Sequence, residues 1–308
     1  MKNIFSLVIP VYFNEETLLQ LFEKILIVEK ELHHLGVDLD LIFIDDGSKD
    51  KSLSKLLEIK KKRDSTKIIK LSKNFGANQA IKCALEHIKG NCFMALAADL
   101  QDPPELISSM VEKWISGSKL IICQRRTRKD PFFTKFFASI YYKIIRTVVM
   151  KNYPKSGYDM ALMDKIYLKY ILNSSKGLYI PLLVPWLGIE PEVIFYDRPK
   201  RPYGSSKWTF SKKLNVFFDT VFGFTVFPMR LLSGIGFFTS LLSFLYGINI
   251  ILNAIFGNIP VAGYATIVVL ISFLLGLVIM MLGLIGEYIW RIYEEVNKRP
   301  SAVIEEIF

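Results

Sequence analysis

Residues 231–286 form a stretch of 56 residues without a single charged side chain. Soluble domains of this size do not contain such a stretch, so the sequence excludes a purely water-soluble protein. As helices, residues 231–256 would be about 39 Å long and residues 266–286 about 32 Å long. Both lengths exceed the roughly 30 Å hydrocarbon core of a bilayer. We therefore predict two transmembrane helices joined by a short uncharged turn.

The charges on either side of this stretch predict its orientation. Basic residues precede it (Lys212, Lys213 and Arg230) and follow it (Arg291, Lys298 and Arg299), whereas the turn carries none. This pattern places both ends in the cytoplasm, so we expect a multi-pass protein of the cytoplasmic (inner) membrane.

The first twelve residues, interrupted by Pro10, predict no signal peptide. Asn249 and Asn253 are interpreted as helix–helix contacts, which disfavours a pore or a flippase.

The remaining charge is concentrated in the first 230 residues, which hold 36 of the 39 Lys and Arg residues and 24 of the 29 acidic ones. A basic surface beside two membrane helices suits acidic lipid headgroups better than nucleic acid.

Segments 132–150 and 208–230 are amphipathic and are predicted to lie in the membrane interface, the alternative being that they cover a soluble core. Cys83, Cys92 and Cys123 have no paired spacing and are read as reduced core thiols.

The first part of the chain alternates short apolar runs with helical patterns. We predict strands at 5–12, 39–44, 67–71, 92–97 and 119–123, and helices at 15–35, 50–62, 77–89 and 103–117. This order predicts an α/β fold with an open, mainly parallel, Rossmann-like sheet covered on both faces. Ligands of such sheets bind beyond the carboxyl ends of the strands.

Polar residues follow each predicted strand. Asp and Ser alone are ordinary helix caps, but five polar turns at one sheet edge predict a site. Carboxylates there suit a divalent metal on a diphosphate, and the basic residues 125–129 suit a second anion. The absence of a Gly-x-Gly-x-x-Gly motif and of a Walker loop disfavours dinucleotide oxidoreductases and P-loop enzymes. The three histidines (His33, His34 and His87) lack ligand spacing and are expected at the surface.

At these residues the chain resembles the family 2 glycosyltransferases with a GT-A fold. More narrowly, it is similar to the polyprenyl-phosphate glycosyltransferase group, which includes bactoprenol glucosyltransferase and dolichol-phosphate mannosyltransferase. The matching segments run in family order over almost the whole chain: Ile9-Pro10-Val11-Tyr12, Ile44-Asp45-Asp46-Gly47-Ser48-Lys49-Asp50, Asn74-Phe75-Gly76, Ala98-Asp99-Leu100-Gln101-Asp102-Pro103-Pro104-Glu105, Gly204-Ser205-Ser206-Lys207 and Ile285-Gly286-Glu287-Tyr288. The resemblance is specific for the reaction type and weak for the sugar.

The resemblance implies a role for each matching position. The nucleotide base and ribose would be lined by Pro10, Tyr12, Glu15, Asp46 and Ala98. Asp99 and Gln101 would coordinate Mg²⁺ or Mn²⁺. The donor diphosphate and the acceptor phosphate would be gathered by Arg125, Arg201 and Lys207. Asp159, in Gly157-Tyr158-Asp159, would lie near the sugar or the acceptor.

The chain departs from the family pattern at two positions. Phe13 is inserted before Asn14 and Glu15, and Ala97 stands where the family's Asp-x-Asp motif has its first carboxylate. The second departure should weaken metal or ribose contacts, and it leaves Asp99, Gln101 and Asp102 to hold a cation.

The resemblance implies an inverting, metal-dependent glycosyltransferase at the cytoplasmic face of the membrane. Its donor would be UDP-glucose or a UDP-N-acetylhexosamine, its acceptor undecaprenyl phosphate, and its product a lipid-linked sugar for modifying cell-envelope glycans. The expected domains are a GT-A domain (1–207), an interfacial helix (208–230), the two spans (231–286) and a cytosolic tail (287–308). A homo-oligomer is compatible with the sequence.

Two other functions remain open at this point. One is a membrane scaffold that binds a nucleotide sugar without catalysis, since one Asp of the motif is missing. The other is a processive polysaccharide synthase, which would need more spans and a Gln-x-x-Arg-Trp signature that the chain lacks.

Overall fold

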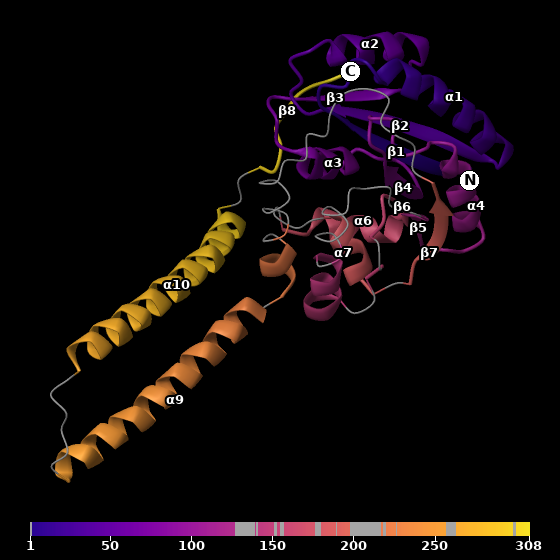
Figure 1. The fold of residues 1–308 in the computed structure, drawn as a ribbon. Helices are drawn as coiled ribbons and strands as arrows, with labels where there is room; N and C mark the ends of the chain where they lie inside the picture. The colour runs from indigo at the N-terminus through magenta and orange to yellow at the C-terminus, as the bar shows by residue number, and fades with distance from the viewer. Residues whose placement is uncertain are drawn as a thin grey trace. The chain divides into compact units, whose positions relative to one another are not determined.

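The computed structural model describes residues 2–126, 139, 141–150, 153–154, 157–175, 180–188, 190–197, 217, 220–225, 227–256, 263–297 and 300–308. The chain divides into two compact units (Figure 1). The first unit comprises Met1–Thr220 together with Arg299–Phe308, and the second comprises Val221–Lys298.

The first unit is built on one sheet, which has eight strands among the described residues, in the order β7-β5-β6-β4-β1-β2-β3-β8. Their bounds are β1 (Asn3–Val11), β2 (Val37–Asp45), β3 (Lys67–Leu71), β4 (Cys92–Ala95), β5 (Leu120–Arg125), β6 (Met160–Asp164), β7 (Glu192–Tyr196) and β8 (Ile304–Ile307). β1 pairs in parallel with β2 and β4, and β2 pairs in parallel with β3. β6 runs antiparallel between β4 and β5, while β7 is parallel to β5. β1 to β5 and β7 therefore all point the same way.

Helices cover both faces of this sheet (Figure 1). The helices α1 (Leu18–His34), α2 (Ser52–Lys62) and α4 (Leu106–Ile115) bury side chains in one apolar cluster with alternate residues of the central strands. In α1 the buried residues recur every three or four positions, as one face of a helix requires: Leu18, Leu21, Phe22, Ile25, Val28 and Leu32. α3 (Ala77–Leu85) contacts β1 and β2 from the other face.

The predicted α/β fold class is confirmed, and all five predicted strands and four predicted helices are present. Their ends differ by a few residues; the helix expected over 77–89, for example, ends at Leu85. β6, β7 and β8 were not predicted. β6 and β7 are no shorter than the predicted β3 and β4, but they come after the regular alternation of strands and helices, and β8 has the sequence Ile-Glu-Glu-Ile, which contains no apolar run. Three short helices, η2 (Lys165–Tyr167), α6 (Leu168–Leu172) and α7 (Ile180–Trp186), connect β6 to β7.

The two segments predicted to be interfacial are described only in part. In 132–150, residues 141–144 are helical and lead into a π-helical turn, η1 (Ile145–Val149). In 208–230, residues 220–224 are helical, and most of 208–219 lies outside the described residues. The rings of Tyr141 and Phe217 have centroids 6.2 Å apart, so the two segments contact each other. Their expected position in the membrane interface stays a prediction.

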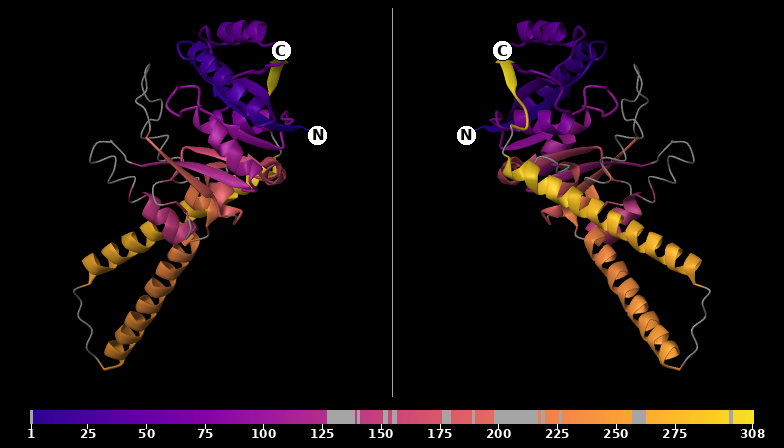
Figure 2. Two further views of the ribbon diagram at one scale, coloured as in Figure 1. Left: turned by 90° about the vertical axis from the view of Figure 1, so that its right-hand side faces the viewer. Right: turned by 90° about the vertical axis from the view of Figure 1, so that its left-hand side faces the viewer.

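The second unit consists of two long helices, α9 (Phe227–Ile255) and α10 (Tyr264–Val296), which Figure 2 shows side-on. By length and composition each can cross a membrane, at Phe227–Tyr246 and Phe273–Tyr293, and neither window is buried within the protein. Large apolar side chains such as Phe237, Phe244 and Ile279 are more than 60% exposed. α10 continues ten residues beyond Gly286, where its charged last turns contain an ion pair between Arg291 and Glu287 (2.9 Å).

The end of the chain is part of the first unit. β8 pairs antiparallel with β3, with the Phe308 N–H donating to the Ile68 carbonyl (2.9 Å) and the Ser72 N–H donating to the Val303 carbonyl (3.0 Å). Lys70 and Glu305 form an ion pair across the two strands (2.6 Å). The segment expected as a cytosolic tail therefore ends as an edge strand of the sheet, and both ends of the two-helix unit connect to the first unit.

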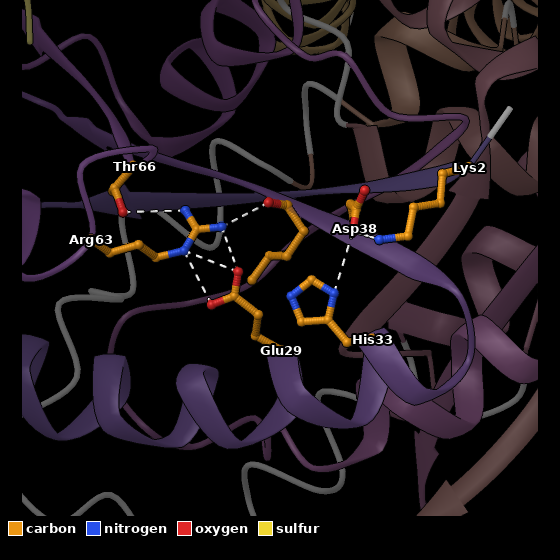
Figure 3. A network of polar contacts seen from close by, with 7 residues as sticks. Lys2, Glu29, His33, Asp38, Arg63 and Thr66 are labelled. Atoms are coloured by element: carbon orange, nitrogen blue, oxygen red, sulfur yellow. Dashed lines mark hydrogen bonds and ion pairs between the residues drawn. The ribbon is translucent and has the colours of Figure 1, made fainter.

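The amino edge of the sheet is held by ion pairs (Figure 3). Arg63, after α2, binds both oxygens of Glu29 on α1 and donates to the Leu39 carbonyl at 2.8 Å. Asp38, at the start of β2, accepts from Lys2 (2.7 Å) and lies 3.3 Å from His33. These charges therefore neutralise one another in the described structure.

Asp164 at the end of β6 provides a test of the fold. Its carboxylate accepts from Trp114 Nε1 (2.9 Å), Lys119 Nζ (3.0 Å) and the Ile166 N–H (3.0 Å). Burial alone would raise the pKa of Asp164, but these donors outweigh it and lower the pKa. We expect Asp164→Asn to reduce the free energy of unfolding by about 2 kcal/mol at pH 7, because hydrogen bonds to a charge are lost.

Thermal unfolding of the purified chain would measure this loss, with the exposed Asp64→Asn as a control. Since folding lowers the pKa of Asp164, its stabilisation is present above the ordinary carboxyl pKa of about 3.9 and disappears as the pH falls through the folded value. The difference between wild type and Asp164→Asn should therefore vanish in acid; a difference that grew there would contradict this assignment.

Candidate active site

The direction of the strands brings the five polar turns to one edge of the sheet. β1, β2, β3, β4 and β5 end there, because each runs the same way. β6 runs in the opposite direction, so its start lies at this edge as well and brings Asp159 to it. The structure thus gathers predicted residues from six separate positions in the chain.

The turn after β1 is strained at the inserted residue. Phe13 has a φ of 55°, a left-handed conformation that costs a bulky residue about 1–3 kcal/mol. Its N–H donates to Ser48 Oγ (3.2 Å), and the Tyr12 N–H donates to Asn14 Oδ1 (2.9 Å). The inserted Phe13 side chain is 40% exposed, so the insertion is accommodated as an outward turn.

Three predicted site residues flank this turn in the sequence: Pro10, Tyr12 and Glu15. Pro10 and Tyr12 are half-buried at the end of β1. Glu15 Oε2 accepts the Lys51 N–H at 2.7 Å, immediately before α2. Glu15 therefore fixes the start of a helix in this structure, a contact that sequence reasoning did not anticipate.

Asp46 binds the loop that follows β3. Its two oxygens accept the N–H groups of Phe75 (2.7 Å) and Gly76 (2.9 Å). The neighbouring Gly47 has a φ of 70°, and a Cβ there would lie 2.6 Å from the Lys73 carbonyl carbon. Only glycine permits this close approach. Burial raises the pKa of Asp46, although the two backbone donors act in the opposite direction.

Asp45 is a residue that the sequence analysis left without a role. It is 1% exposed, and its Oδ1 accepts the Ser48 N–H (3.2 Å). Its Oδ2 is buried and accepts no hydrogen bond from any described residue. Burial raises the pKa of this carboxyl. A buried carboxylate oxygen without a donor costs folding free energy, and Asp45 Oδ2 is such an oxygen at this edge of the sheet.

The turn after β4 carries the predicted metal ligands. Asp99 Oδ1 accepts the Gln101 N–H (3.1 Å), and Leu100 between them has a φ of 60°. Thr17 Oγ1 donates to the Ala98 carbonyl (2.6 Å), which ties this turn to the start of α1. Asp99 and Gln101 are half-buried, whereas Ala98 and Leu100 belong to the apolar core. The turn therefore anchors its apolar residues and leaves a carboxylate and an amide partly accessible.

The donor set of this turn is compatible with a hard cation. Carboxylate and amide oxygens are the ligands that Mg²⁺ and Mn²⁺ prefer. No group of three or more His, Cys, Asp and Glu side chains with metal-site geometry occurs among the described residues. The residues present therefore suit a cation that takes other ligands from a bound diphosphate.

Arg125 and Asp159 form a bidentate ion pair. Arg125 Nε donates to Asp159 Oδ2 (2.7 Å) and Nη2 donates to Oδ1 (2.5 Å). Burial alone would lower the pKa of Arg125, but Asp159 outweighs it and raises the pKa. The hydroxyl of Tyr196, which the sequence analysis missed, donates to Asp159 Oδ2 at 2.9 Å. Arg201 and Lys207, predicted to act with Arg125, lie outside the described residues.

The chain is similar to one protein family and to several known proteins. The family model described as Glycosyl transferase family 2 matches residues 6–172. An uncharacterized glycosyltransferase of Synechocystis, sll0501, is 35% identical over 98% of this chain and 95% of its own length. The bactoprenol glucosyl transferase of Shigella phage SfII is 33% identical over 98% of this chain and 97% of its own. A solved glucosyl-3-phosphoglycerate synthase of Mycobacterium tuberculosis is 14% identical and covers 66% of this chain and 73% of its own, with a TM-score of 0.46.

The Asp46 contacts predict a measurable change in the loop after β3. We expect Asp46→Asn to speed hydrogen exchange of the Phe75 and Gly76 amides by about three- to tenfold, because one carboxylate acceptor becomes an amide donor. Hydrogen–deuterium exchange with mass spectrometry would measure it, with the exposed Asp64→Asn as a control. Unchanged exchange in this loop would show that Asp46 does not hold it.

Proposed function

The chain belongs to glycosyl transferase family 2 and is a glycosyltransferase, and from this premise we propose that it transfers a sugar from a nucleotide sugar to a polyprenyl phosphate. The observation that carries the proposal is the similarity to bactoprenol glucosyl transferases over 97–98% of the chain, which includes the two-helix unit. We further propose a UDP-sugar donor, either UDP-glucose or a UDP-N-acetylhexosamine, and undecaprenyl phosphate as acceptor.

The loops after β1, β2 and β3 would bind the nucleotide. Asp46 and Gly47 hold two of these loops together. Pro10, Tyr12 and Glu15 line the same end of the sheet. The turn with Asp99 and Gln101 would hold Mg²⁺ or Mn²⁺, which supplies positive charge to the departing diphosphate.

The acceptor phosphate would approach from the side of β5 and β6. A lipid phosphate is already an anion, so it attacks the anomeric carbon in one inverting displacement without strong general-base help. The main difficulty is bringing two anions together, which calls for cationic side chains. Asp159 neutralises Arg125 through their ion pair. We therefore propose that Arg201 and Lys207 provide the remaining positive charge and that Asp159 orients Arg125 toward the sugar or the acceptor.

The two helices would anchor the site at the membrane surface. Because the chain enters the helical unit from the sheet and returns to the sheet at β8, both flanks of the hairpin belong on one side of the bilayer. The basic flanks favour the cytoplasmic side, where the nucleotide sugar is made. Anchoring concentrates and aligns the lipid acceptor beside the donor.

The decisive experiment is a donor panel. Purified full-length protein would be incubated with undecaprenyl phosphate, Mn²⁺ and individual nucleotide sugars, and the lipid products would be identified by mass spectrometry. We expect one UDP-sugar to give a polyprenyl-phosphate monosaccharide. Binding of a nucleotide sugar without any lipid product would instead support the non-catalytic scaffold, which the replacement of a carboxylate by Ala97 keeps as the second candidate.

Removing the proposed metal ligand should stop transfer. We expect Asp99→Ala to lower the turnover rate by at least about 100-fold, because the diphosphate loses its electrostatic stabilisation. Glu16→Ala, which removes an exposed carboxylate of the same sheet edge, is the control and should retain transfer. Membrane insertion should be equal in both variants. Full transfer by Asp99→Ala would exclude this metal site.

The proposed orientation predicts which residues are accessible from outside the cell. In intact spheroplasts, an impermeant maleimide should label Asn258→Cys, between α9 and α10, and should label Ser301→Cys only after permeabilisation. The three native cysteines are buried, and burial raises the pKa of Cys83 to about 11 and that of Cys123 to about 12, so they should stay unlabelled. The reverse labelling pattern would refute this orientation.

A further inference from the structure

Tyr196 occupies an unusual position for a residue at the end of an edge strand. It ends β7, and its carbonyl accepts the Arg126 N–H (2.9 Å), which fixes it beside Arg125 in the parallel β5–β7 pair. From there its side chain reaches past the ends of β5 and β6. The hydroxyl lies 2.9 Å from Asp159 Oδ2 and 3.4 Å from Asp102 Oδ1. One side chain thus connects groups that belong to four neighbouring strands.

The ring and the hydroxyl of Tyr196 do different things. The residue is 5% exposed, and its ring belongs to the same apolar cluster as Ala98 and Leu100 of the turn after β4. Asp102, in the segment that follows this turn, is also 5% exposed. A phenyl ring without the hydroxyl would fill this space equally well, so packing alone does not require a tyrosine. Among the described residues, the hydroxyl donates to the carboxylates of Asp159 and Asp102.

The hydroxyl has one proton for two acceptors. The proton is shared between Asp159 Oδ2, at 2.9 Å, and Asp102 Oδ1, at 3.4 Å, so the bond to Asp102 is the weaker of the two. Asp159 also binds Arg125 through both of its oxygens. Arg125, Asp159, Tyr196 and Asp102 therefore form one connected chain from the end of β5 to the turn that holds Asp99 and Gln101.

We propose that Tyr196 is a positioning residue for the transfer reaction. Its hydroxyl links the turn with the metal ligands to the Arg125–Asp159 pair, and so sets the donor diphosphate at a fixed position relative to the side where the sugar and the acceptor bind. The proposal rests on the proposed function for its chemistry. The hydrogen bonds that form the link are present among the described residues and do not depend on that function.

The test compares two variants that each remove one buried phenolic hydroxyl. Tyr196→Phe keeps the ring and breaks the link. Tyr167→Phe is the matched control, because the Tyr167 hydroxyl is buried at the start of α6 and makes no hydrogen bond to any described residue. Each variant is made in the full chain and studied in lipid nanodiscs.

The first measurement is hydrogen exchange of the amides of residues 99–102, which needs neither metal nor substrate. We expect Tyr196→Phe to exchange about three- to tenfold faster than wild type there, the effect of losing one hydrogen bond, and Tyr167→Phe to match wild type. Equal exchange in wild type and Tyr196→Phe, or equal acceleration in both variants, would overturn the proposal.

The second measurement separates positioning from a merely structural role. Mn²⁺ affinity in the presence of UDP should fall by about 10–100-fold in Tyr196→Phe, the usual cost of removing a group that orients metal ligands. The turnover rate should fall with it while the KM for the lipid stays unchanged. A lower unfolding temperature with normal Mn²⁺ affinity and turnover would show that the hydroxyl is only structural and would overturn the proposal.

The two proposals fail in distinguishable ways. If wild type binds Mn²⁺ and UDP but transfers no sugar to polyprenyl phosphate, the proposed function is wrong, while exchange and Mn²⁺ affinity still decide the role of Tyr196. If wild type transfers sugar and Tyr196→Phe does so equally well, the proposed function stands and the positioning role is excluded.

Discussion

Parallel pairing of β1 with its two neighbours is the constraint on which the remaining structure depends. Because β1, β2 and β4 run in one direction, every connection between them must cross a face of the sheet, and the crossing helices bury both faces. The same pairing sends the polar turns to one edge. Burial of the faces and assembly of the site are therefore two results of a single arrangement of backbone hydrogen bonds.

Charged side chains are partnered differently at the two edges of the sheet. At the amino edge, Arg63 and Glu29 satisfy each other, and the surrounding charges form further pairs. At the carboxyl edge, buried carboxylates are used to hold loops, as Asp46 does, or are left with an oxygen that no described residue satisfies, as in Asp45. Such an arrangement costs folding free energy, and local conflicts of this kind are expected at functional or strained sites.

The sequence predicted the strands of the regular alternation, β1 to β5, and the edge at which their turns gather. Contacts that depend on the order of the strands in the sheet could not be predicted. β6 lies between β4 and β5 although it comes later in the chain, and only this insertion brings Asp159 to Arg125. The contacts of Asp45 and Asp46 could not be predicted from the sequence either. The two carboxylates are adjacent in one motif, and their contacts differ because the backbone points the two side chains in different directions. Tyr196 gave no signal, since an aromatic residue ending a short strand is ordinary in a core.

The returning strand β8 ties the end of the chain to the sheet of the first unit. Without this pairing, α10 would be connected to the first unit only through α9. Pairing with β3 instead attaches the end of α10 to the strand whose following loop is held by Asp46. The apolar helices are therefore joined to the sheet at two places far apart in sequence, and one of them is next to the proposed nucleotide loops. Antiparallel hydrogen bonds to β3, with Phe308 packed on the core, give this second attachment the stability of the sheet itself.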